Sequence, residues 1–235
     1  MNFINSQKKK AVTFSFDDGV TQDIRLIDLM NKYNLKGTFN LNSELFAKKG
    51  MLTRPDGSRI AHYKVHPEDV KVIYEGHEVA VHTLTRPNLT QLEDSEVIRQ
   101  VETDRLNLSE LVGYEVIGMA YPCGGVNNDD RVAEIIKNNT GVKYSRTITS
   151  THNFDLQENL FRFNPTVYYI QLDKMMELGR EFVDLKTETP KIFYIWGHSY
   201  EMDIASDYWV KLEEFFKLIS GRDDIFYGTN KEVIL

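Results

Sequence analysis

The stretch VTFSFDDG (Val12–Gly19) decides the fold that we expect for this chain of 235 residues. Bulky apolar residues alternate with small or polar ones up to Phe16, which is typical of a β-strand with two different faces. The bulky face would pack against helices, and the face of Ser15 and Asp17 would turn toward the inside of a barrel. Two carboxylates and a glycine end the strand, at the point where barrel enzymes keep their catalytic groups.

Strand-like and helical segments alternate from this stretch to the end of the chain. We expect strands over residues 10–16, 36–41, 77–82, 116–121, 142–145, 161–170, 191–196 and 225–228. We expect helices over residues 21–33, 43–49, 67–76, 92–111, 129–138, 172–185 and 207–220, and an irregular insertion over 51–64. Helices between strands imply crossover connections. The pattern therefore predicts an α/β fold, a barrel of seven or eight mainly parallel strands, in a single domain over residues 1–235.

The composition excludes several classes of protein. Hydrophobic residues make up 41% of the chain and charged residues 27%, which is typical of an ordered globular protein. The formal net charge of -7 argues against nucleic acid as a partner, because nucleic-acid-binding proteins carry a basic face. No run of about 18 apolar residues, the length of a membrane helix, occurs. The single cysteine, Cys123, excludes an internal disulfide and a multi-cysteine zinc site.

The beginning of the chain bears on its location. Residues 1–10 are polar and lead directly into the first expected strand, without the apolar segment of a signal peptide. This start predicts a cytoplasmic protein. A chain whose leader had been removed would look the same.

Polar groups suited to catalysis follow four of the expected strands. Asp17 and Asp18 form an adjacent pair, in which one carboxylate can bind a cation while the other takes a proton from water. His82 follows another strand, and a carboxylate together with an imidazole begins a facial metal site. After a third strand, the backbone N–H of Cys123 is a candidate donor to an oxyanion. His198 follows a fourth strand.

Each of these groups also has a purely structural interpretation. Asp and Gly are ordinary turn residues, so the DDG sequence alone is equally well explained by a strand-ending turn. A single histidine at a strand end is more often structural than a metal ligand. Ser145 and Arg146 end a further strand, where a surface salt bridge would contribute little. Several such strand ends on one rim of one barrel are more specific together than any is alone.

In this order the motifs resemble those of the polysaccharide deacetylase superfamily, the NodB-homology domain of carbohydrate esterase family 4. The resemblance extends from Val12 to about Thr229. SFDDG (Ser15–Gly19) is similar to the first family motif and is the most specific match, whereas YPCG (Tyr121–Gly124) is similar to the third motif only in outline. The resemblance implies an irregular (β/α) barrel.

The resemblance also implies roles for single residues. It implies Asp17 as the general base and His198 as the catalytic acid. It implies Asp18 and His82 as ligands of a divalent metal, zinc in the first place. The backbone N–H of Cys123 is the expected oxyanion donor. Substrate-binding or supporting roles are expected for Arg86, Tyr121, Arg146 and Trp196.

Two positions depart from the family pattern. Arg86 stands where the family has a second metal histidine, four residues after His82, and a guanidinium cannot donate a lone pair to a metal. We therefore expect metal binding to be weak or absent, with the Arg86 side chain turned toward Asp18 or toward solvent. Ala120 stands where many relatives have an arginine that pairs with the catalytic Asp, and Arg146 is a candidate to supply that charge.

The remaining polar residues are less informative. His62 and His66 are four residues apart, like ligands on a helix, but they surround the expected insertion and a helix start. We expect both to be surface or rim residues. Asp155 and Glu201 are both candidates to orient His198.

Three functions are compatible with this sequence. The first is a hydrolase that removes acetyl groups from N- or O-acetylated carbohydrate by metal-assisted acid–base catalysis. The second is metal-independent hydrolysis of a C–N bond in a small ureide or amide, which Arg86 favours. The third is a catalytically weakened relative that binds carbohydrate, since a fold does not determine a function. In each case the expected partner is a carbohydrate or another small acylated compound.

Overall fold

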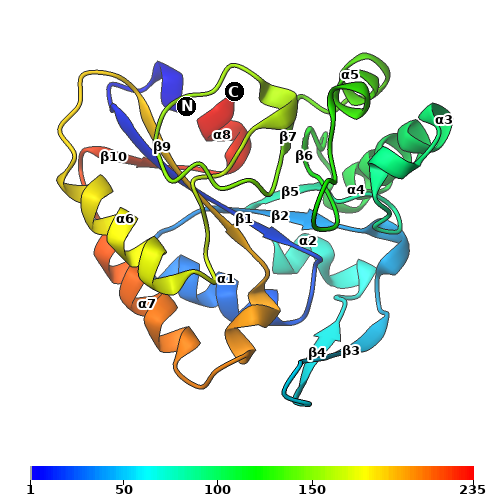
Figure 1. The fold of residues 1–235 in the computed structure, drawn as a ribbon, viewed down its shortest axis with the longest axis horizontal. Helices are drawn as coiled ribbons and strands as arrows, with labels where there is room; N and C mark the ends of the chain where they lie inside the picture. The colour runs from blue at the N-terminus through cyan, green and yellow to red at the C-terminus, as the bar shows by residue number, and fades with distance from the viewer. Residues whose placement is uncertain (1) are drawn as a thin grey trace.

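The main sheet curls into a barrel-like shape in the computed structural model, which describes residues 2–235 (Figure 1). Its strands are β1 (Lys10–Asp17), β2 (Gly37–Leu41), β5 (Glu78–Val81), β6 (Gly118–Ala120), β7 (Tyr144–Arg146), β8 (Val167–Tyr168), β9 (Lys191–Gly197) and β10 (Ile225–Tyr227). The order across the sheet is β7-β6-β5-β2-β1-β9-β8, with β10 beside β1, and these pairings are parallel. The predicted α/β fold, an irregular barrel of mainly parallel strands, is confirmed.

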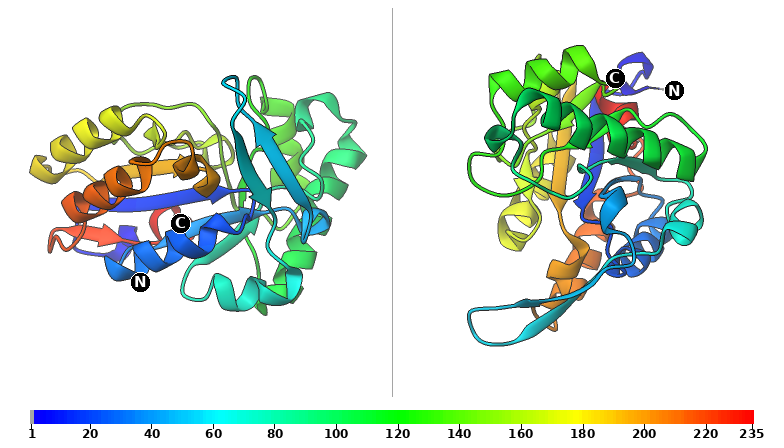
Figure 2. Two further views of the ribbon diagram at one scale, coloured as in Figure 1. Left: turned by 90° about the horizontal axis from the view of Figure 1, so that it is seen from below. Right: turned by 90° about the vertical axis from the view of Figure 1, so that its right-hand side faces the viewer.

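Helices pack against this sheet, all but the last of them on its outside. They are α1 (Gln22–Lys32), α2 (Val70–Ile73), α3 (Asp94–Ile98), α4 (Asp104–Val112), α5 (Asp130–Asn139), α6 (Leu172–Asp184), α7 (Tyr208–Ile219) and α8 (Asn230–Ile234). A π-helical turn, Arg99–Thr103, joins α3 to α4, so the long helix expected over 92–111 is present with an interruption. α6 and α7 pack side by side on one flank (Figures 1 and 2). None of the helices in residues 2–235 is long and apolar enough to cross a membrane.

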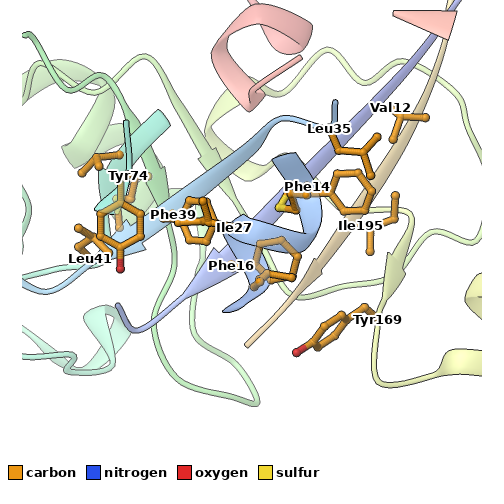
Figure 3. Packing of buried hydrophobic residues seen from close by; sticks show 14 of the residues in the cluster. Val12, Phe14, Phe16, Ile27, Leu35, Phe39, Leu41, Tyr74, Tyr169 and Ile195 are labelled. Carbon is orange, nitrogen blue, oxygen red and sulfur yellow. The ribbon is translucent and has the colours of Figure 1, made fainter. Parts of the chain in front are cut away.

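The alternation of β1 determines which side chains meet the helices. Val12, Phe14 and Phe16 are buried in the main hydrophobic core between sheet and helices (Figure 3). Ala11 points the other way and packs with Tyr194 in the smaller core inside the barrel. The predicted division between an outer bulky face and an inner face is therefore confirmed. Burying each phenylalanine contributes about 1.5–3 kcal/mol, so a shift of register by one residue would be strongly unfavourable.

The two edges of the sheet are linked by a short extended segment rather than by the long strand expected over 161–170. Phe163 N–H donates to the Ser145 carbonyl of β7 at 2.9 Å, and Thr166 N–H donates to the Tyr194 carbonyl of β9 at 2.8 Å. Only β8 within this segment forms a regular ladder. The sequence contains Pro165, which has no N–H to donate and interrupts the pairing.

The insertion over 51–64 is not irregular, and this prediction was wrong. It forms an antiparallel hairpin of β3 (Lys49–Thr53) and β4 (Arg59–Tyr63), which projects from the body of the protein (Figures 1 and 2). Gly57, with φ +84°, supplies the turn. The helix expected over 43–49 is also wrong, because only a 3₁₀ turn, Ser43–Leu45, forms there.

Candidate active site

The carboxyl ends of the parallel strands bring the predicted polar groups together. Asp17 ends β1 and Arg146 ends β7, while His82 and His198 directly follow β5 and β9. They surround a pocket of about 350 Å³. The pocket is lined by Asp17, His82, Arg86, Tyr121, Cys123, Gly124, Ile148, Tyr168, Trp196 and His198. Two further residues contact the side chains of this lining: Asp18 pairs with Arg86, and Arg146 pairs with Asp17.

Asp17 is held in place by a buried ion pair. Arg146 Nη2 lies 2.6 Å from both carboxylate oxygens, and Asn40 Nδ2 donates to Oδ1 at 2.8 Å. Burial alone would raise the pKa of Asp17, but the charge of Arg146, with His82 and His198, lowers it below its ordinary value. Asp17 is therefore a carboxylate at neutral pH. The expected pairing with Arg146, in place of the arginine missing at position 120, is seen in the structure.

Two imidazoles face the same oxygen of Asp17. His82 Nε2 and His198 Nε2 each lie 3.9 Å from Asp17 Oδ2, too far for a direct hydrogen bond. His82 Nδ1 lies 2.9 Å from the Ala120 carbonyl, which only accepts, so Nδ1 carries the proton. Burial lowers the pKa of His82 despite the nearby carboxylates. Its Nε2 is thus an unprotonated acceptor without a hydrogen-bond partner in residues 2–235.

Of the two candidates to orient His198, Glu201 is the one that lies beside it. Its Oε2 accepts the His198 backbone N–H at 3.1 Å, and its Oε1 lies 3.3 Å from His198 Nδ1. The Tyr168 hydroxyl donates to the same Oε1. Asp155, the other candidate, pairs instead with Lys191 at 2.5 Å near the surface.

Burial shifts the pKa values of Glu201 and His198 in opposite directions. Burial, with Asp17 and Asp18 nearby, raises the pKa of Glu201 to about 8. Burial lowers the pKa of His198 to about 4. At neutral pH the Glu201 carboxyl therefore keeps its proton and the His198 imidazole is neutral, with Glu201 Oε1 3.3 Å from His198 Nδ1.

Asp18 is surrounded by nitrogen groups. Arg86 Nε lies 2.9 Å and Lys64 Nζ 3.6 Å from Asp18 Oδ1, and His62 Nε2 lies 3.2 Å from Oδ2. Lys64 also donates to the Asp18 carbonyl and to Asn42 Oδ1. Burial would raise the pKa of Asp18, but the His62 hydrogen bond and the two cations hold it well below its ordinary value. Of the two expected orientations of Arg86, the structure shows the one toward Asp18.

Lys64 and His62 were missed by sequence reasoning. The sequence predicts a surface or rim position for His62, yet its ring bonds to Asp18 and packs edge-on against Tyr200 at 4.9 Å between ring centroids. The hairpin explains both positions, because residues two apart on a strand share a face and Lys64 bridges to Val20 beside Asp18. The sequence around His62 and Lys64 has no clear strand alternation, so it offers no signal that would place the two side chains beside Asp18.

A divalent metal is implied by the resemblance, and the residues around Asp18 do not fit one as they stand. The resemblance implies two ligands that are present here, Asp18 and His82, whose Oδ1 and Nε2 lie 3.8 Å apart. Structural and catalytic zinc sites use at least three protein ligands. The third position is Arg86, and both Arg86 and Lys64 put a positive charge against the oxygen that a metal would need. Within residues 2–235 no cluster of three His, Cys, Asp or Glu side chains suits a metal.

The loop after β6 presents a free backbone donor. Cys123 has φ +71°, and its N–H donates to no group in residues 2–235. The side chain of Asn127 holds this loop by donating to the carbonyls of Pro122 at 3.0 Å and Cys123 at 2.9 Å. Tyr121, expected near the substrate, donates its hydroxyl to the Phe161 carbonyl at 2.7 Å and so supports the wall of the pocket.

The opposite wall of the pocket is aromatic. Trp196 and Tyr168 stack with ring centroids 4.4 Å apart, and the Arg146 guanidinium lies 4.5 Å from the Trp196 ring centroid. Trp196 Nε1 is buried and has no hydrogen-bond partner in residues 2–235. Tyr168 and Arg146 therefore pack on the Trp196 ring and hold it in the wall of the pocket.

Comparison with known proteins places these motifs in a family. The family model described as polysaccharide deacetylase matches residues 4–144. The peptidoglycan-N-acetylmuramic acid deacetylase PdaC of Bacillus subtilis is 27% identical over 126 residues, covering 52% of this chain and 23% of its own. The peptidoglycan-N-acetylglucosamine deacetylase PgdA of Listeria monocytogenes is 27% identical over 134 residues, covering 56% of this chain and 25% of its own. The match thus spans about a quarter of the length of these curated relatives.

Solved structures share the fold at low sequence identity. A mutant of BA3943, a CE4 family pseudoenzyme with restored enzymatic activity, superposes with a TM-score of 0.60 at 18% identity, covering 97% of this chain and 68% of its own. The family 4 carbohydrate esterase from Streptomyces lividans, in complex with acetate, superposes with a TM-score of 0.57 at 12% identity, covering 94% and 93%. At these identities the likeness shows the fold alone.

Proposed function

The chain belongs to the polysaccharide deacetylase family, and we propose that it hydrolyses an acetyl group of an acetylated carbohydrate without a resident divalent metal. The observation that carries this proposal is the convergence of Asp17, His82 and His198 on one pocket, with Asp17 held as a carboxylate. The relatives PdaC and PgdA, which are named as deacetylases of peptidoglycan sugars, support an acetylated sugar as substrate.

The first step is attack of water on the acetyl carbonyl carbon. Water between Asp17 Oδ2 and His82 Nε2 can donate one hydrogen to each acceptor, which turns an oxygen lone pair toward the substrate. Asp17 takes a proton as the new C–O bond forms, and general base catalysis of this kind contributes about 10²–10⁴-fold. The Arg146 ion pair keeps Asp17 ionised and fixed for this step.

The negative charge that develops on the carbonyl oxygen needs donors within the pocket. The Cys123 N–H has no other partner in residues 2–235, and the Arg86 guanidinium lines the same pocket. Preorganised donors of this kind stabilise a tetrahedral intermediate because they need no reorganisation during the reaction. Arg86 and Lys64 supply positive charge beside Asp18.

The second step breaks the bond between the acyl carbon and the leaving nitrogen or oxygen. The leaving group takes its proton from His198, which is resupplied by Glu201 across their 3.3 Å contact. Asp17 then returns the proton that it took from water to the His198–Glu201 pair. This return restores the starting protonation of all three groups. The products are the deacetylated sugar and acetic acid, which ionises to acetate by giving its proton to the freed amine or to solvent.

One observation favours a second function, metal-independent hydrolysis of a C–N bond in a small ureide or amide. Arg86 and Lys64 keep fixed positive charge at the pocket without any metal, and this arrangement suits a small polar substrate as well as a sugar. The same acid–base groups would act, with an amine or ammonia as the leaving group.

A substrate screen separates the two functions. Purified protein is incubated with N-acetylated and O-acetylated oligosaccharides and, separately, with small ureides and amides, and the release of acetate and of ammonia is measured. We expect acetate from at least one acetylated oligosaccharide and no ammonia from the small compounds. Ammonia without acetate would favour the second function. Neither product, from folded protein, would contradict both.

A further inference from the structure

A second pocket adjoins the catalytic pocket and is strongly basic. It has a volume of about 390 Å³ and shares Arg86 with the catalytic pocket. Its other ionisable lining residues are Lys48, Lys49, His62 and Lys64. Within residues 2–235 no carboxylate lines it. Such a concentration of cations is unexpected for a chain whose formal net charge is -7.

The neutralising charge available to this pocket is smaller than the positive charge around it. Asp18 lies beneath the pocket and already pairs with Arg86, Lys64 and His62. Neither Lys48 nor Lys49 forms an ion pair within residues 2–235, and both side chains are exposed.

Like charges gathered in one place raise the free energy of the unliganded protein. A bound anion would lower it. Lysine ammonium groups and an arginine fork are the donors that proteins use for carboxylates and phosphates. Arg86 lines both pockets, so the basic pocket begins one side chain away from the pocket of Asp17 and His198. A substrate that reaches the catalytic pocket can therefore extend into the basic one.

We propose that the basic pocket binds an anionic group of the substrate, a carboxylate or a phosphate carried next to the sugar that loses its acetyl group. The proposal rests on the proposed deacetylation and specifies its substrate class as acidic acetylated carbohydrate. Lys48 and Lys49 act here as specificity residues, since they contact the neighbouring group and not the reacting acetyl. Because both lie at the base of the β3–β4 hairpin, the hairpin is the element that creates this preference.

Three matched disaccharides test the proposal. Each carries N-acetylglucosamine as the acetylated sugar, joined to glucose, to glucuronic acid or to glucose 6-phosphate. We expect kcat/KM for acetate release to be at least about tenfold higher for one or both charged disaccharides than for the neutral one, through a lower KM. The carboxylate and phosphate arms show which anion is preferred. Equal kcat/KM on all three would overturn the proposal.

A charge-matched pair of double variants assigns the effect to the pocket. Lys48→Gln/Lys49→Gln should reduce the preference for the charged disaccharide by about fivefold, because each exposed pair contributes modestly. The control is Lys9→Gln/Lys143→Gln, which removes the same charge from exposed lysines at the opposite ends of the strands. The control should keep the wild-type preference. If both double variants lose it equally, net charge and not the pocket is responsible, and the proposal fails.

Binding separates a failure of this proposal from a failure of the proposed function. Titration calorimetry of the full chain with glucuronic acid and with inorganic phosphate measures the pocket without any turnover. If no acetate is released from any substrate but an anion binds and Lys48→Gln/Lys49→Gln weakens it, the deacetylation is wrong and the anion pocket stands. If acetate is released but neither anion binds nor increases kcat/KM, the pocket assignment is wrong and the deacetylation stands.

Discussion

At the level of single residues, the proposed chemistry depends on how Asp17 is held. Its partner Arg146 is 0% exposed and contacts both carboxylate oxygens, so the pair forms one buried unit. Removing one member of a buried ion pair typically costs about 3–5 kcal/mol, because the other charge is left unpaired. Substitution of Asp17 therefore tests stability and catalysis together, and the two effects have to be separated.

Asp17→Asn should reduce kcat for acetate release by about 10²–10⁴-fold, because an amide cannot take the proton of the water. It should also lower the free energy of unfolding by about 3–5 kcal/mol through the unpaired Arg146. Urea unfolding and acetate release measure the two effects. The double variant Asp17→Asn/Arg146→Met should regain stability and no activity. Near-wild-type activity in folded Asp17→Asn would show that another group is the base.

The protonation of Glu201 predicts in which direction kcat/KM changes with pH. Burial raises the pKa of Glu201 to about 8, so the carboxyl keeps its proton below that pH and loses it as the pH rises through about 8. Because His198 draws on this proton, kcat/KM should fall on the alkaline side of about 8. Glu201→Gln should lower the rate most for substrates with poor leaving groups and should remove this alkaline limb. An unchanged alkaline limb in the variant would mean that Glu201 only packs against His198.

Arg86 and Lys64 together are expected to keep a divalent metal away from Asp18. Arg86→His supplies the missing ligand but leaves Lys64 Nζ 3.6 Å from Asp18 Oδ1. We expect zinc affinity, measured by titration calorimetry, to rise in Arg86→His and to rise further in Arg86→His/Lys64→Met. The single variant Lys64→Met, with two ligands and Arg86 in place, is the control and should bind weakly. Tight stoichiometric zinc in the unmodified chain would contradict this explanation.

At the level of elements, α8 is a part of the barrel that sequence reasoning did not anticipate. It closes the end of the barrel opposite the catalytic pocket, packing on β1 and on the N-terminal turn. The side chain of Asn230 donates to Thr13 Oγ1 at 2.8 Å and accepts from the Tyr194 hydroxyl at 2.7 Å. Thr229 and Glu232 form a capping box, a pattern visible in the sequence, so this helix start was recognisable.

Asn230→Ala should lower the free energy of unfolding by about 2 kcal/mol, because it leaves buried partners on β1 and β9 without hydrogen bonds. Activity at low temperature should be retained, since the residue lies at the far end of the barrel. Asn138→Ala, at an exposed position of α5, is the matched control and should change stability little. Equal unfolding curves for wild type and Asn230→Ala would show that α8 is not part of the cooperative unit.

The β3–β4 hairpin shows why the site was only partly predictable. Its turn residues and its exposed strands, which have little alternation of apolar side chains, give no clear strand pattern, and the sequence therefore predicts an irregular insertion. Its consequence for the site is large, because it carries His62 to Asp18 and leads into Lys64. Contacts of this kind depend on how an insertion folds back over the barrel, and no local spacing encodes that.

At the level of the whole molecule, the parts predicted best are those that a repeating pattern encodes. The alternation of side chains predicts the inner and outer faces of β1. The parallel direction of the strands predicts that the polar residues at their carboxyl ends share one rim, namely Asp17, His82, Arg146 and His198. Strand lengths were overestimated where a proline or a turn intervenes, as at Pro165. The partner of His198 stayed open between two carboxylates, because only the 3₁₀ turn after β9 brings Glu201 back to it.

The chemistry proposed for this site hydrolyses an acetyl group with positive charge from Arg86 and Lys64 in place of a divalent metal. The most direct test measures kcat/KM for acetate release by protein treated with a chelator, with its metal content determined by elemental analysis, before and after addition of zinc. We expect the chelator-treated protein to contain less than one metal per chain and to keep its full kcat/KM, and we expect zinc not to increase it. Loss of activity with the chelator and recovery with stoichiometric zinc would instead show that the site needs a metal.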